Sequence, residues 1–557
     1  MDTNVAVDRP GSDDASPALS DRQLELLRPF GRTRSVRAGN VLFRAGDADY
    51  AFYVVIDGRV AVIDEYEGTE RTLAEHGPRE FVGDVEVLTG GIAFAAAVVT
   101  QNGELLEVPA ARLRDVVEQE PALSELIVHA LLLRRSRLIG QGGCVEILGS
   151  QVSPETQRVR RFLRRNSVPH AVSDPRRDTR AQRRLSRAGA TRAQMPVVLS
   201  ARGRPLVNPT NAELGEALGL GAAAPRTEPY DLVIIGSGPA GLAASVYAAS
   251  DGLAVGLVEA LAPGGQAGTS PRIENYLGFP AGVSGTELTQ RAVIQAVKFG
   301  ADFLLSRAAE TLGTTPDGRH AVGLDDGTEL VAHAVIVATG ARYRRLEVPG
   351  ADRYEAFGLY YAATHLSADD SRGQDAIVVG GGNAAGQAAL SLSSYASRVH
   401  LVVRGADLSA TMSRYLIDRI AANGRVELAT SSRIVELVGD DRLEGAVVES
   451  AEGAVRTLPV RAVFALLGAE PRTGWMPGTI ARDPHGFVLT GGAVGASARS
   501  PALWTAHRRI PASLETSVPR VLAAGDVRAG SVKRVASAVG EGAAAARLVC
   551  ETLISTP

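Results

Sequence analysis

The stretch Tyr230–Glu259, YDLVIIGSGPAGLAASVYAASDGLAVGLVE, decides how this chain folds. Leu232–Ile235 is a short apolar run typical of a buried parallel strand. The glycines of GSGPAG, residues 236–241, allow a tight turn, a close approach of a pyrophosphate and close packing of the next helix. A second strand, Ala254–Val258, ends in Glu259, where a carboxylate accepts from ribose hydroxyls. The stretch therefore predicts a Rossmann-like unit that binds a dinucleotide. Its predicted contact residues are Gly236, Ser237, Gly238, Gly241 and Glu259.

The composition of the chain excludes several other classes of protein. The 557 residues suggest roughly three or four domains of ~150 residues. The net charge of -3 provides no general attraction to nucleic acid or membrane. The two cysteines, Cys144 and Cys550, exclude a CxxC motif, a cysteine-rich metal site and a disulfide framework. The start lacks the features of a signal peptide, and no apolar run reaches the ~18 residues of a membrane span. We therefore expect a cytoplasmic protein with no metal site and no membrane contact.

The N-terminal quarter has a different pattern. Residues 1–18 are polar and acidic, which predicts a disordered tail. Residues 19–140 predict a helix over Leu19–Phe30, a β-roll of short alternating strands, and an amphipathic helix over Ala111–Leu138. Within the roll, Asp57–Gly58 is expected to form a turn between two strands.

Residues 19–140 resemble a cyclic-nucleotide-binding domain. The residues that carry the resemblance are Phe52-Tyr53-Val54-Val55, Gly58 and Phe81-Val82-Gly83-Asp84. In that family a Gly-Glu pair precedes a turn whose arginine holds the cyclic phosphate. Here Asp84 replaces the glutamate and residues 89–100 contain no arginine, so a bound phosphate would lack its charge-assisted hydrogen bonds. The sequence favours a domain of this fold that binds no cyclic nucleotide. The alternative is a cyclic-nucleotide site in which another cation, such as Arg79, serves the phosphate.

Residues 143–222 predict a small α/β domain that resembles the glutaredoxin-like thioredoxin folds, with Pro196 at the position of the family's cis-proline. In that family a nucleophilic cysteine begins the first helix, where the helix dipole lowers its pKa. Ser153 stands at that position, and Cys144 lies outside the motif. Because a hydroxyl does not replace a thiolate in disulfide exchange, the domain is expected to be inactive as a redoxin.

Arginines crowd the first helix of this domain and the segment after it. They are Arg158, Arg160, Arg161, Arg164, Arg165, Arg176, Arg177, Arg180, Arg183 and Arg184. The favoured interpretation is a solvated helical face. A docking patch for an acidic partner or a polynucleotide is the alternative, but no aromatic residues interleave with these arginines, which counts against binding of single-stranded nucleic acid.

A second dinucleotide-type unit follows in the C-terminal half. Ala376–Val379 predicts a strand, GGGNAA over 380–385 a turn, and Gly386–Tyr395 a helix. The next strand, Val399–Val403, ends in Arg404, and a cation at this position suits the 2′-phosphate of NADPH. Near the end of the chain, a Gly525-Asp526 turn offers a carboxylate to a ribityl hydroxyl.

Residues 228–557 resemble the thioredoxin reductase family. The matching motifs are Pro263-Gly264-Gly265-Gln266, Glu274-Asn275 before Gly278-Phe279, Ala338-Thr339-Gly340, Gly380-Gly381-Gly382-Asn383 and Ala523-Ala524-Gly525-Asp526. The resemblance implies FAD in 228–345 and 471–557, NADPH in the inserted 346–470, and a homodimer. It adds Gly265, Gln266, Asn275, Thr339, Gly340, Gly525 and Asp526 to the FAD site, and it assigns Gly380, Gly382, Asn383 and Arg404 to the NADPH site.

The departure from that family lies in 358–365, GLYYAATH. The family carries a CxxC there, and Ala362 and His365 occupy its two cysteine positions. A flavin cannot pass electrons to a disulfide that is absent, so the dithiol route to thioredoxin is expected to fail. His365 is a candidate proton donor near the flavin, with a purely structural role as the alternative.

Together these patterns predict an α/β protein with two nested Rossmann-like dinucleotide-binding domains, preceded by a β-roll domain and a small thioredoxin-like α/β domain. We expect an enzyme that transfers hydride from NADPH to FAD and then electrons to an external acceptor, a protein or small molecule that the sequence does not identify. The alternatives are an enzyme similar to ferredoxin/flavodoxin–NADP reductases, or a flavin redox sensor that does not turn over.

Overall fold

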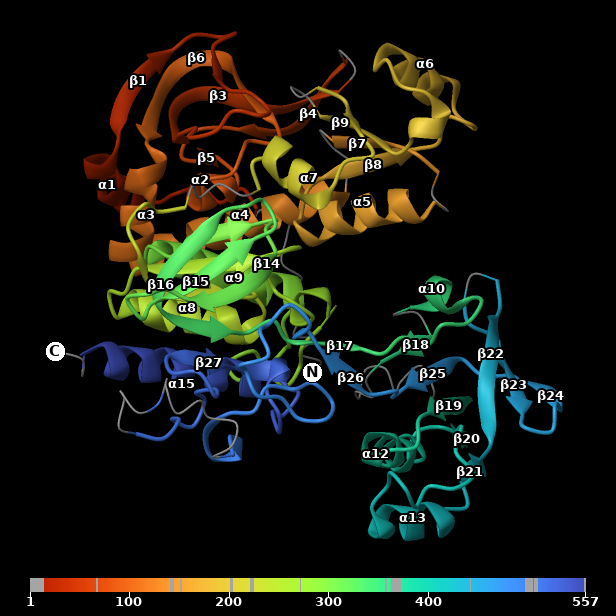
Figure 1. Ribbon diagram of the computed structural model, residues 1–557. Coiled ribbons are helices and arrows are strands. Elements are labelled where there is room, and N and C mark those ends of the chain that lie inside the picture. The colour runs from red at the N-terminus through yellow and green to blue at the C-terminus, as the bar shows by residue number, and fades with distance from the viewer. Residues whose placement is uncertain are drawn as a thin grey trace, which may run out of the picture. The chain divides into compact units, whose positions relative to one another are not determined.

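The computed structural model describes residues 15–66, 69–140, 145–150, 153–200, 204–220, 225–270, 272–355, 358–361, 372–440, 442–495, 504 and 509–554. The chain divides into two compact units (Figure 1). The first comprises Met1–Gly340 and Arg472–Pro557, and the second Ala341–Pro471. Within the described ranges, no helix is long and apolar enough to cross a membrane.

The first unit begins with a six-stranded β-roll in the order β1-β6-β3-β4, in which β2 pairs with β6 and β5 with β3. The strands are β1 (Arg32–Val36), β2 (Val41–Phe43), β3 (Phe52–Tyr66), β4 (Thr69–His76), β5 (Phe81–Val82) and β6 (Ala96–Val108). The helices are α1 (Asp21–Leu27), α2 (Glu86–Thr89), α3 (Ala110–Gln119) and α4 (Pro121–Gly140). Phe52, Phe81 and Leu105 are fully buried in the core that the sheet and the helices enclose.

Three predictions for this region need correction. Asp57–Gly58 does not separate two strands but lies within β3, where Gly58 has φ 90° and the pairing with β6 shifts register. The helix predicted over Ala111–Leu138 breaks between α3 and α4 at Glu120, because the residue before Pro121 disfavours helical geometry. The predicted tail is packed at its end, where Ala15 is buried; residues 1–14 lie outside the described ranges.

The second domain is the expected small α/β unit, with a sheet in the order β10-β9-β7-β8. Its strands are β7 (Val145–Leu148), β8 (His170–Ser173), β9 (Val197–Ser200) and β10 (Leu206–Val207), and its helices are α5 (Pro154–Arg165), α6 (Thr179–Arg187) and α7 (Asn211–Ala217). The Met195–Pro196 bond is cis, as the resemblance predicted. The Ser153 hydroxyl accepts from the Thr156 N–H at 3.4 Å and thereby caps α5. Cys144 lies outside the described ranges.

The rest of the first unit is a seven-stranded sheet in the order β13-β12-β11-β16-β15-β14, with β27 beside β16. The strands are β11 (Tyr230–Ile235), β12 (Val255–Glu259), β13 (Asp302–Leu305), β14 (Ala309–Thr314), β15 (His320–Leu324), β16 (Glu329–Val337) and β27 (Val521–Ala523). The strands β13, β12, β11, β16 and β27 run parallel, which brings their carboxyl ends to one edge. Three helices pack with this sheet: α8 (Pro239–Ser250), α9 (Gly285–Lys298) and α15 (Val535–Ile554).

The second unit contains another parallel sheet, in the order β18-β25-β19-β20-β21. Its strands are β18 (Leu359–Tyr360), β19 (Asp375–Val379), β20 (Arg398–Val402), β21 (Val426–Ala429) and β25 (Ala462–Ala465), and α12 (Asn383–Leu392) and α13 (Arg414–Ala421) share its core. A three-stranded sheet of β22 (Ser432–Val438), β23 (Gly445–Ser450) and β24 (Val455–Leu458) adds to it, with the short α10 (Ala351–Tyr354). The unit begins with β17 (Ala341–Tyr343) and ends with β26 (Ala469–Pro471), which pair antiparallel. This unit is therefore an insertion whose two ends are neighbours.

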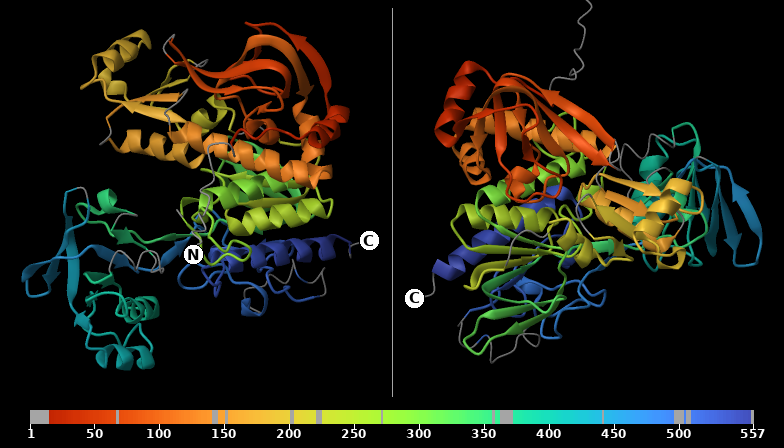
Figure 2. Two further views of the ribbon diagram at one scale, coloured as in Figure 1. Left: turned by 180° about the vertical axis from the view of Figure 1, so that it is seen from behind. Right: turned by 90° about the horizontal axis from the view of Figure 1, so that it is seen from above.

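Within the first unit, α4 lies between the β-roll and α9 (Figures 1 and 2). Glu125 on α4 pairs with Arg291 on α9 at 3.2 Å. Ile294, also on α9, is buried in the hydrophobic core of the β-roll. The N-terminal domain is therefore joined to the sheet that carries the first glycine turn by both apolar and charged contacts.

Candidate functional site

The first glycine turn connects β11 to α8 at the carboxyl edge of the sheet. Gly238 is the N-cap of α8 and no side chain caps the helix, so the first N–H groups are free to bind an anion. Gly236 has φ 102°, and a Cβ there would lie 2.5 Å from the Ala338 carbonyl oxygen. A Cβ on Gly241 would overlap the Gly236 carbonyl oxygen. The turn therefore requires glycine at both positions, because a side chain there would collide with backbone atoms.

Glu259 ends β12 beside this turn, as the sequence predicted. Its Oε2 accepts from the Ser237 backbone N–H at 3.0 Å and from the Ser237 hydroxyl at 2.8 Å. Its Oε1 accepts from the Leu261 N–H at 2.9 Å. The carboxylate is thereby held in one orientation next to the glycine turn, as a ribose ligand requires.

Two further loops from distant parts of the sequence meet the same turn. The Gly264 N–H donates to the Ser237 carbonyl at 2.8 Å, and a Cβ on Gly265 would lie 2.9 Å from the Gly238 Cα. A Cβ on Gly525 would lie 2.9 Å from the Ala240 Cβ. The site is therefore assembled at the carboxyl ends of β11, β12 and β27, where dinucleotides bind in open parallel sheets.

Asp526 follows on the short turn after β27. Burial raises the pKa of its carboxyl group, with the nearby Lys533 opposing and Glu541 reinforcing that effect. The Lys533 ammonium donates to the Asp526 carbonyl at 3.0 Å, and the Gly525 N–H donates to Glu541 at 2.7 Å. The turn is thus anchored from both sides.

The other predicted FAD residues are less closely tied to the turn. The Thr339 hydroxyl donates to the Arg472 carbonyl at 3.0 Å, and Gly340 has φ 68°. Gln266 follows Gly265 and is exposed. Asn275 is also exposed, on the loop that the Ile273–Val283 bridge closes, and no hydrogen bond to the glycine turn is found among the described residues.

The second unit holds a turn of the same kind between β19 and α12. Gly380 has φ 145°, and a Cβ there would lie 2.5 Å from the Leu466 carbonyl oxygen. Gly382 is the N-cap of α12, without a side-chain cap. The Asn383 side chain accepts from the Ser413 N–H at 2.7 Å and so holds the neighbouring loop. Arg404 is exposed just beyond the end of β20.

Both turns fit a dinucleotide on structural grounds. Each presents the bare N-terminus of a helix and glycines at positions where a side chain would collide with backbone. They differ in the residue that follows the second strand, a fixed carboxylate in the first unit and an exposed guanidinium in the second. The carboxylate suits a free ribose hydroxyl, whereas the guanidinium suits a ribose phosphate.

The thioredoxin-like domain contacts the FAD-side loop, which the sequence did not predict. The Arg165 guanidinium donates to the Gly265 carbonyl at 2.5 Å, and the Asn166 amide donates to the Leu261 carbonyl at 2.9 Å. Arg158 also bonds within its own domain, to Asn211 at 2.9 Å. The interpretation of this arginine cluster as a solvated face is therefore wrong for Arg158 and Arg165. It is also wrong for Arg184, which is largely buried and pairs with the buried Glu146 at 3.0 Å. Arg160, Arg161 and Arg164 are exposed, as that interpretation requires.

A buried arginine joins the first two domains. Arg135 on α4 donates to Asp84 at 2.6 Å, to Glu86 at 2.8 Å and to the Ser167 carbonyl at 3.2 Å. Burial acts to lower the pKa of Arg135, but the two carboxylates outweigh it and raise the pKa. Asp84, which replaces the glutamate of the cyclic-nucleotide-binding family, is therefore bound to Arg135. Arg79, the alternative cation, is exposed and pairs with Asp21 at 2.6 Å.

The cysteine-replacing positions Ala362 and His365 lie outside the described residues. Cys550, by contrast, lies on α15, and its thiol donates to Asp251 at 3.6 Å. Burial raises the pKa of this thiol, and the Asp251 carboxylate adds to the effect. Asp251 directly follows α8, and the glycine turn lies at the other end of that helix. Because α8 is about 18 Å long, Cys550, beside Asp251, lies about that far from the turn.

Comparison with known proteins identifies the family. A model of the pyridine nucleotide-disulphide oxidoreductase family matches residues 230–542, and a model of the cyclic nucleotide-binding domain matches residues 33–120. The chain therefore belongs to the pyridine nucleotide-disulphide oxidoreductase family, and it carries a cyclic nucleotide-binding domain before that region. The predicted fold class and family resemblance are confirmed.

Thioredoxin reductases are prominent among the relatives. That of Yarrowia lipolytica is 32% identical over 58% of this chain and 98% of its own length. An alkyl hydroperoxide reductase component of Escherichia coli is 29% identical over 59% of this chain, and the match spans 60% of that relative's length. The solved thioredoxin reductase of Streptococcus pyogenes covers 59% of this chain and 100% of its own, with 32% identity and a TM-score of 0.51. FAD and NADPH are the cofactors of this family, and the two turns fit them.

Proposed function

We propose that this protein is an NADPH-dependent FAD oxidoreductase that passes electrons to an acceptor outside its own chain. The observation that carries the proposal is the presence of two nucleotide turns in a sequence that has Ala362 and His365 where the thioredoxin reductase family has cysteines. Without two thiols at those positions, the chain has no internal dithiol to take electrons and pass them to a disulfide. The electrons must then leave by another route.

The residues of this chain hold and orient the cofactors. When bound, the flavin supplies the redox chemistry, taking hydride from the nicotinamide and releasing two electrons to the acceptor. The free N–H groups of α8 bind the pyrophosphate, and Glu259 accepts from the ribose hydroxyls. Asp526 accepts from a ribityl hydroxyl. His365 is proposed as a proton donor on the segment that replaces the dithiol.

Arg404 supports the choice of NADPH over NADH. It is exposed at the carboxyl end of β20, where a 2′-phosphate attached to the adenosine ribose would lie. A guanidinium makes two charge-assisted hydrogen bonds to a phosphate and none of that kind to a free hydroxyl. Glu259 at the equivalent place in the first unit would repel a phosphate, which supports assigning FAD to that turn.

A flavin redox sensor is the second candidate. It is supported by the contacts of Arg165 and Asn166 with the loop that carries Gly265, because they place an accessory domain directly on the FAD-binding loop. A sensor would be reduced once by NADPH and then stop, whereas an enzyme would consume NADPH steadily. Cytoplasmic location and a homodimer complete the proposal, on the grounds of cysteine usage and family resemblance.

The test is an acceptor screen after anaerobic reduction by NADPH, with thioredoxin, ferredoxin, flavodoxin and ferricyanide as acceptors. We expect many turnovers with ferricyanide and almost none with thioredoxin. Ala362→Cys combined with His365→Cys is expected to gain disulfide reduction, while the matched Ala362→Ser with His365→Ser is not. Reduction of thioredoxin by the unmodified protein at about 10 per second, a typical enzyme rate, would contradict the proposal. A single stoichiometric reduction with no acceptor in the screen would favour the sensor.

A further inference from the structure

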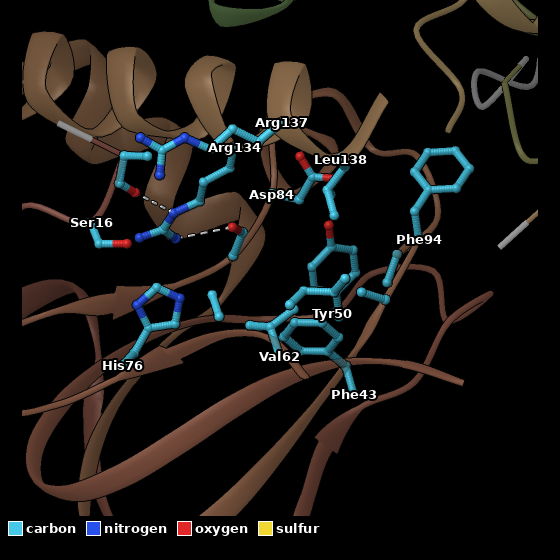
Figure 3. Close-up of a pocket in the computed structure, with 16 residues that line it drawn as sticks. Ser16, Phe43, Tyr50, Val62, His76, Asp84, Phe94, Arg134, Arg137 and Leu138 are labelled. Atoms are coloured by element: carbon cyan, nitrogen blue, oxygen red, sulfur yellow. Dashed lines mark hydrogen bonds between the residues drawn. The ribbon is translucent and has the colours of Figure 1, made fainter. Parts of the chain in front are cut away.

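The β-roll encloses a cavity of 100 Å³ beneath α4 (Figure 3). Most of its wall is apolar, formed by side chains such as Phe43, Tyr50, Val62 and Phe94. Arg134 reaches in from α4, and His76 lies on the opposite wall. The cavity therefore combines an apolar interior with a guanidinium on one side.

Among the described residues, the Arg134 guanidinium forms no ion pair. Its Nε donates to the Ala15 carbonyl at 2.7 Å and its Nη1 to the Gly83 carbonyl at 3.2 Å, so both of its partners are neutral. Its Nη2 is buried without a hydrogen-bond partner among the described residues. Asp84 also lines the cavity, but both of its oxygens are bound to the neighbouring Arg135. Within the described residues, the Arg134 Nη2 thus has no hydrogen-bond acceptor, although the Asp84 and Glu80 carboxylates are near enough to act on the pKa of Arg134.

Two more buried polar atoms in the wall lack partners in the described parts of the chain, the Tyr50 hydroxyl and the His76 Nδ1. The Glu80 carboxylate lies 3.4 Å from that Nδ1 without forming a hydrogen bond with it. Burying a polar atom without a partner costs about 1–3 kcal/mol, so native structures rarely keep several in one place. Three unpartnered polar atoms around a single cavity indicate that the ligand of this cavity carries polar atoms.

The cavity excludes large ligands by its size. Pockets for drug-sized molecules measure about 300–1,000 Å³, and a cavity of about 150 Å³ holds benzene. At 100 Å³ this cavity is smaller than the one that holds benzene, so it accommodates only a short chain of a few carbon atoms. A cyclic nucleotide, with base, sugar and phosphate, does not fit it.

The mostly apolar wall selects among small anions. A phosphate monoester would bring close to two negative charges into it, where burying charge is costly even with Arg134 and Arg137 in the lining. Asp84 and Glu80 nearby would oppose it further. A carboxylate brings one charge and matches the two-pronged geometry of a guanidinium. The apolar wall suits a hydrocarbon body on the same molecule.

We propose that this cavity is a binding site for a compact organic carboxylate with an apolar body, with the carboxylate on Arg134. The site is separate from both nucleotide turns, and the proposal does not depend on the flavin chemistry. It differs from a cyclic-nucleotide site in the size of the ligand and in the helix that supplies the cation.

The experiment uses calorimetric titration of the full-length protein with propanoate, butanoate and 2-methylpropanoate. We expect at least one of them to bind saturably at one site per chain, and its neutral counterpart (propanol, butanol or 2-methylpropanol) to bind at least tenfold more weakly. Arg134→Gln should weaken carboxylate binding about tenfold or more, since a hydrogen bond to a charged group is lost. Arg112→Gln, an exposed arginine on α3, should leave binding unchanged.

A second variant keeps the test valid if Arg134→Gln fails to fold. Ala74→Phe places a ring in the cavity from β4, opposite Val62, and leaves Arg134 in place. It should abolish binding of the carboxylate. The proposal is overturned if none of the three carboxylates binds up to millimolar concentration, if the neutral counterparts bind equally well, or if the filled variant binds as tightly as the unmodified protein.

Discussion

The first compact unit contains the glycine turn proposed for FAD and the β-roll cavity proposed for a carboxylate, and these would recognise their ligands in different ways. The turn offers backbone N–H groups at the start of α8, and a side chain at Gly236 or Gly241 would collide with backbone. The cavity offers the Arg134 guanidinium from α4, a helix that the family motif does not include. A site built from backbone groups therefore tolerates few substitutions. Where a side chain binds the ligand, a different element can supply that side chain without a change of fold.

The largest effect is expected from breaking the backbone-based site. Gly241→Ala places a methyl group on the Gly236 carbonyl oxygen. Overpacking of this kind costs about 1–3 kcal/mol, and because the colliding group is backbone rather than the end of a flexible side chain we expect the upper end, about a hundredfold in FAD affinity. FAD content, measured by absorbance at a fixed protein concentration, checks this. Gly313→Ala is the control because nothing lies within 4 Å of a Cβ there. Full flavin content in Gly241→Ala would show that the turn has room.

Removing a side-chain contact should weaken one ligand and leave the fold unchanged. Arg404→Ala is expected to raise the Michaelis constant for NADPH about tenfold or more, because hydrogen bonds to a charged group contribute about 1.5–3 kcal/mol. The constant for NADH should hardly change. Arg398→Ala, at the other end of β20, is the control. Equal use of NADPH and NADH by the unmodified protein would refute the role of Arg404.

The cavity domain should lose stability in mild acid because of the buried His76. Burial, reinforced by Arg134, lowers the pKa of His76 from 6.5 to about 3, despite Glu80 at 3.4 Å. The unfolded chain then binds the proton more readily, so the stability contributed by neutral His76 is present above pH 6.5 and is lost as the pH falls toward 3. Between pH 7 and pH 5 the loss is about 2 kcal/mol.

Hydrogen exchange of peptides from β4 at the two pH values measures that loss. His76→Gln should remove most of the pH difference in opening free energy, and the exposed His485→Gln should not. A pH difference that persists unchanged in His76→Gln would mean that another group causes it.

The smallest expected effect is the absence of any response to cyclic AMP. Cyclic AMP should change neither the melting temperature nor the turnover, because Asp84 is held by Arg135 and the cavity measures only 100 Å³. A ligand at a hundredfold excess over its dissociation constant would stabilise the fold by about 2.7 kcal/mol, which thermal unfolding detects readily. A clear shift with cyclic AMP would show that the β-roll opens to admit it.

The same contrast explains what the sequence could predict. Gly236 and Gly241 predicted the first turn because a side chain at either position would collide with backbone, and Glu259 followed at the expected distance. The two long parallel-sheet units were predictable for the same reason. Within the β-roll, the turn expected at Asp57–Gly58 turned out to lie within β3, since a glycine bend inside one strand and a turn between two strands leave the same local signal.

No sequence pattern indicates the contacts that long side chains make between domains. Arg134 and Arg135 are consecutive on α4, yet one lines the cavity and the other joins Asp84 to Ser167. Arg165 belongs to a run that resembles a solvated face, and only the packing of two domains brings it to Gly265. These roles depend on tertiary neighbours, which no periodicity or spacing within the helix encodes.

An anaerobic titration of the FAD-loaded protein with NADPH tests most directly whether the flavin is the only two-electron centre in the chain. Hydride carries two electrons, and a flavin accepts two. Because Ala362 and His365 replace the dithiol, about one equivalent of NADPH per flavin should complete the reduction. A requirement for about two equivalents would reveal a second two-electron centre in the chain and contradict the account.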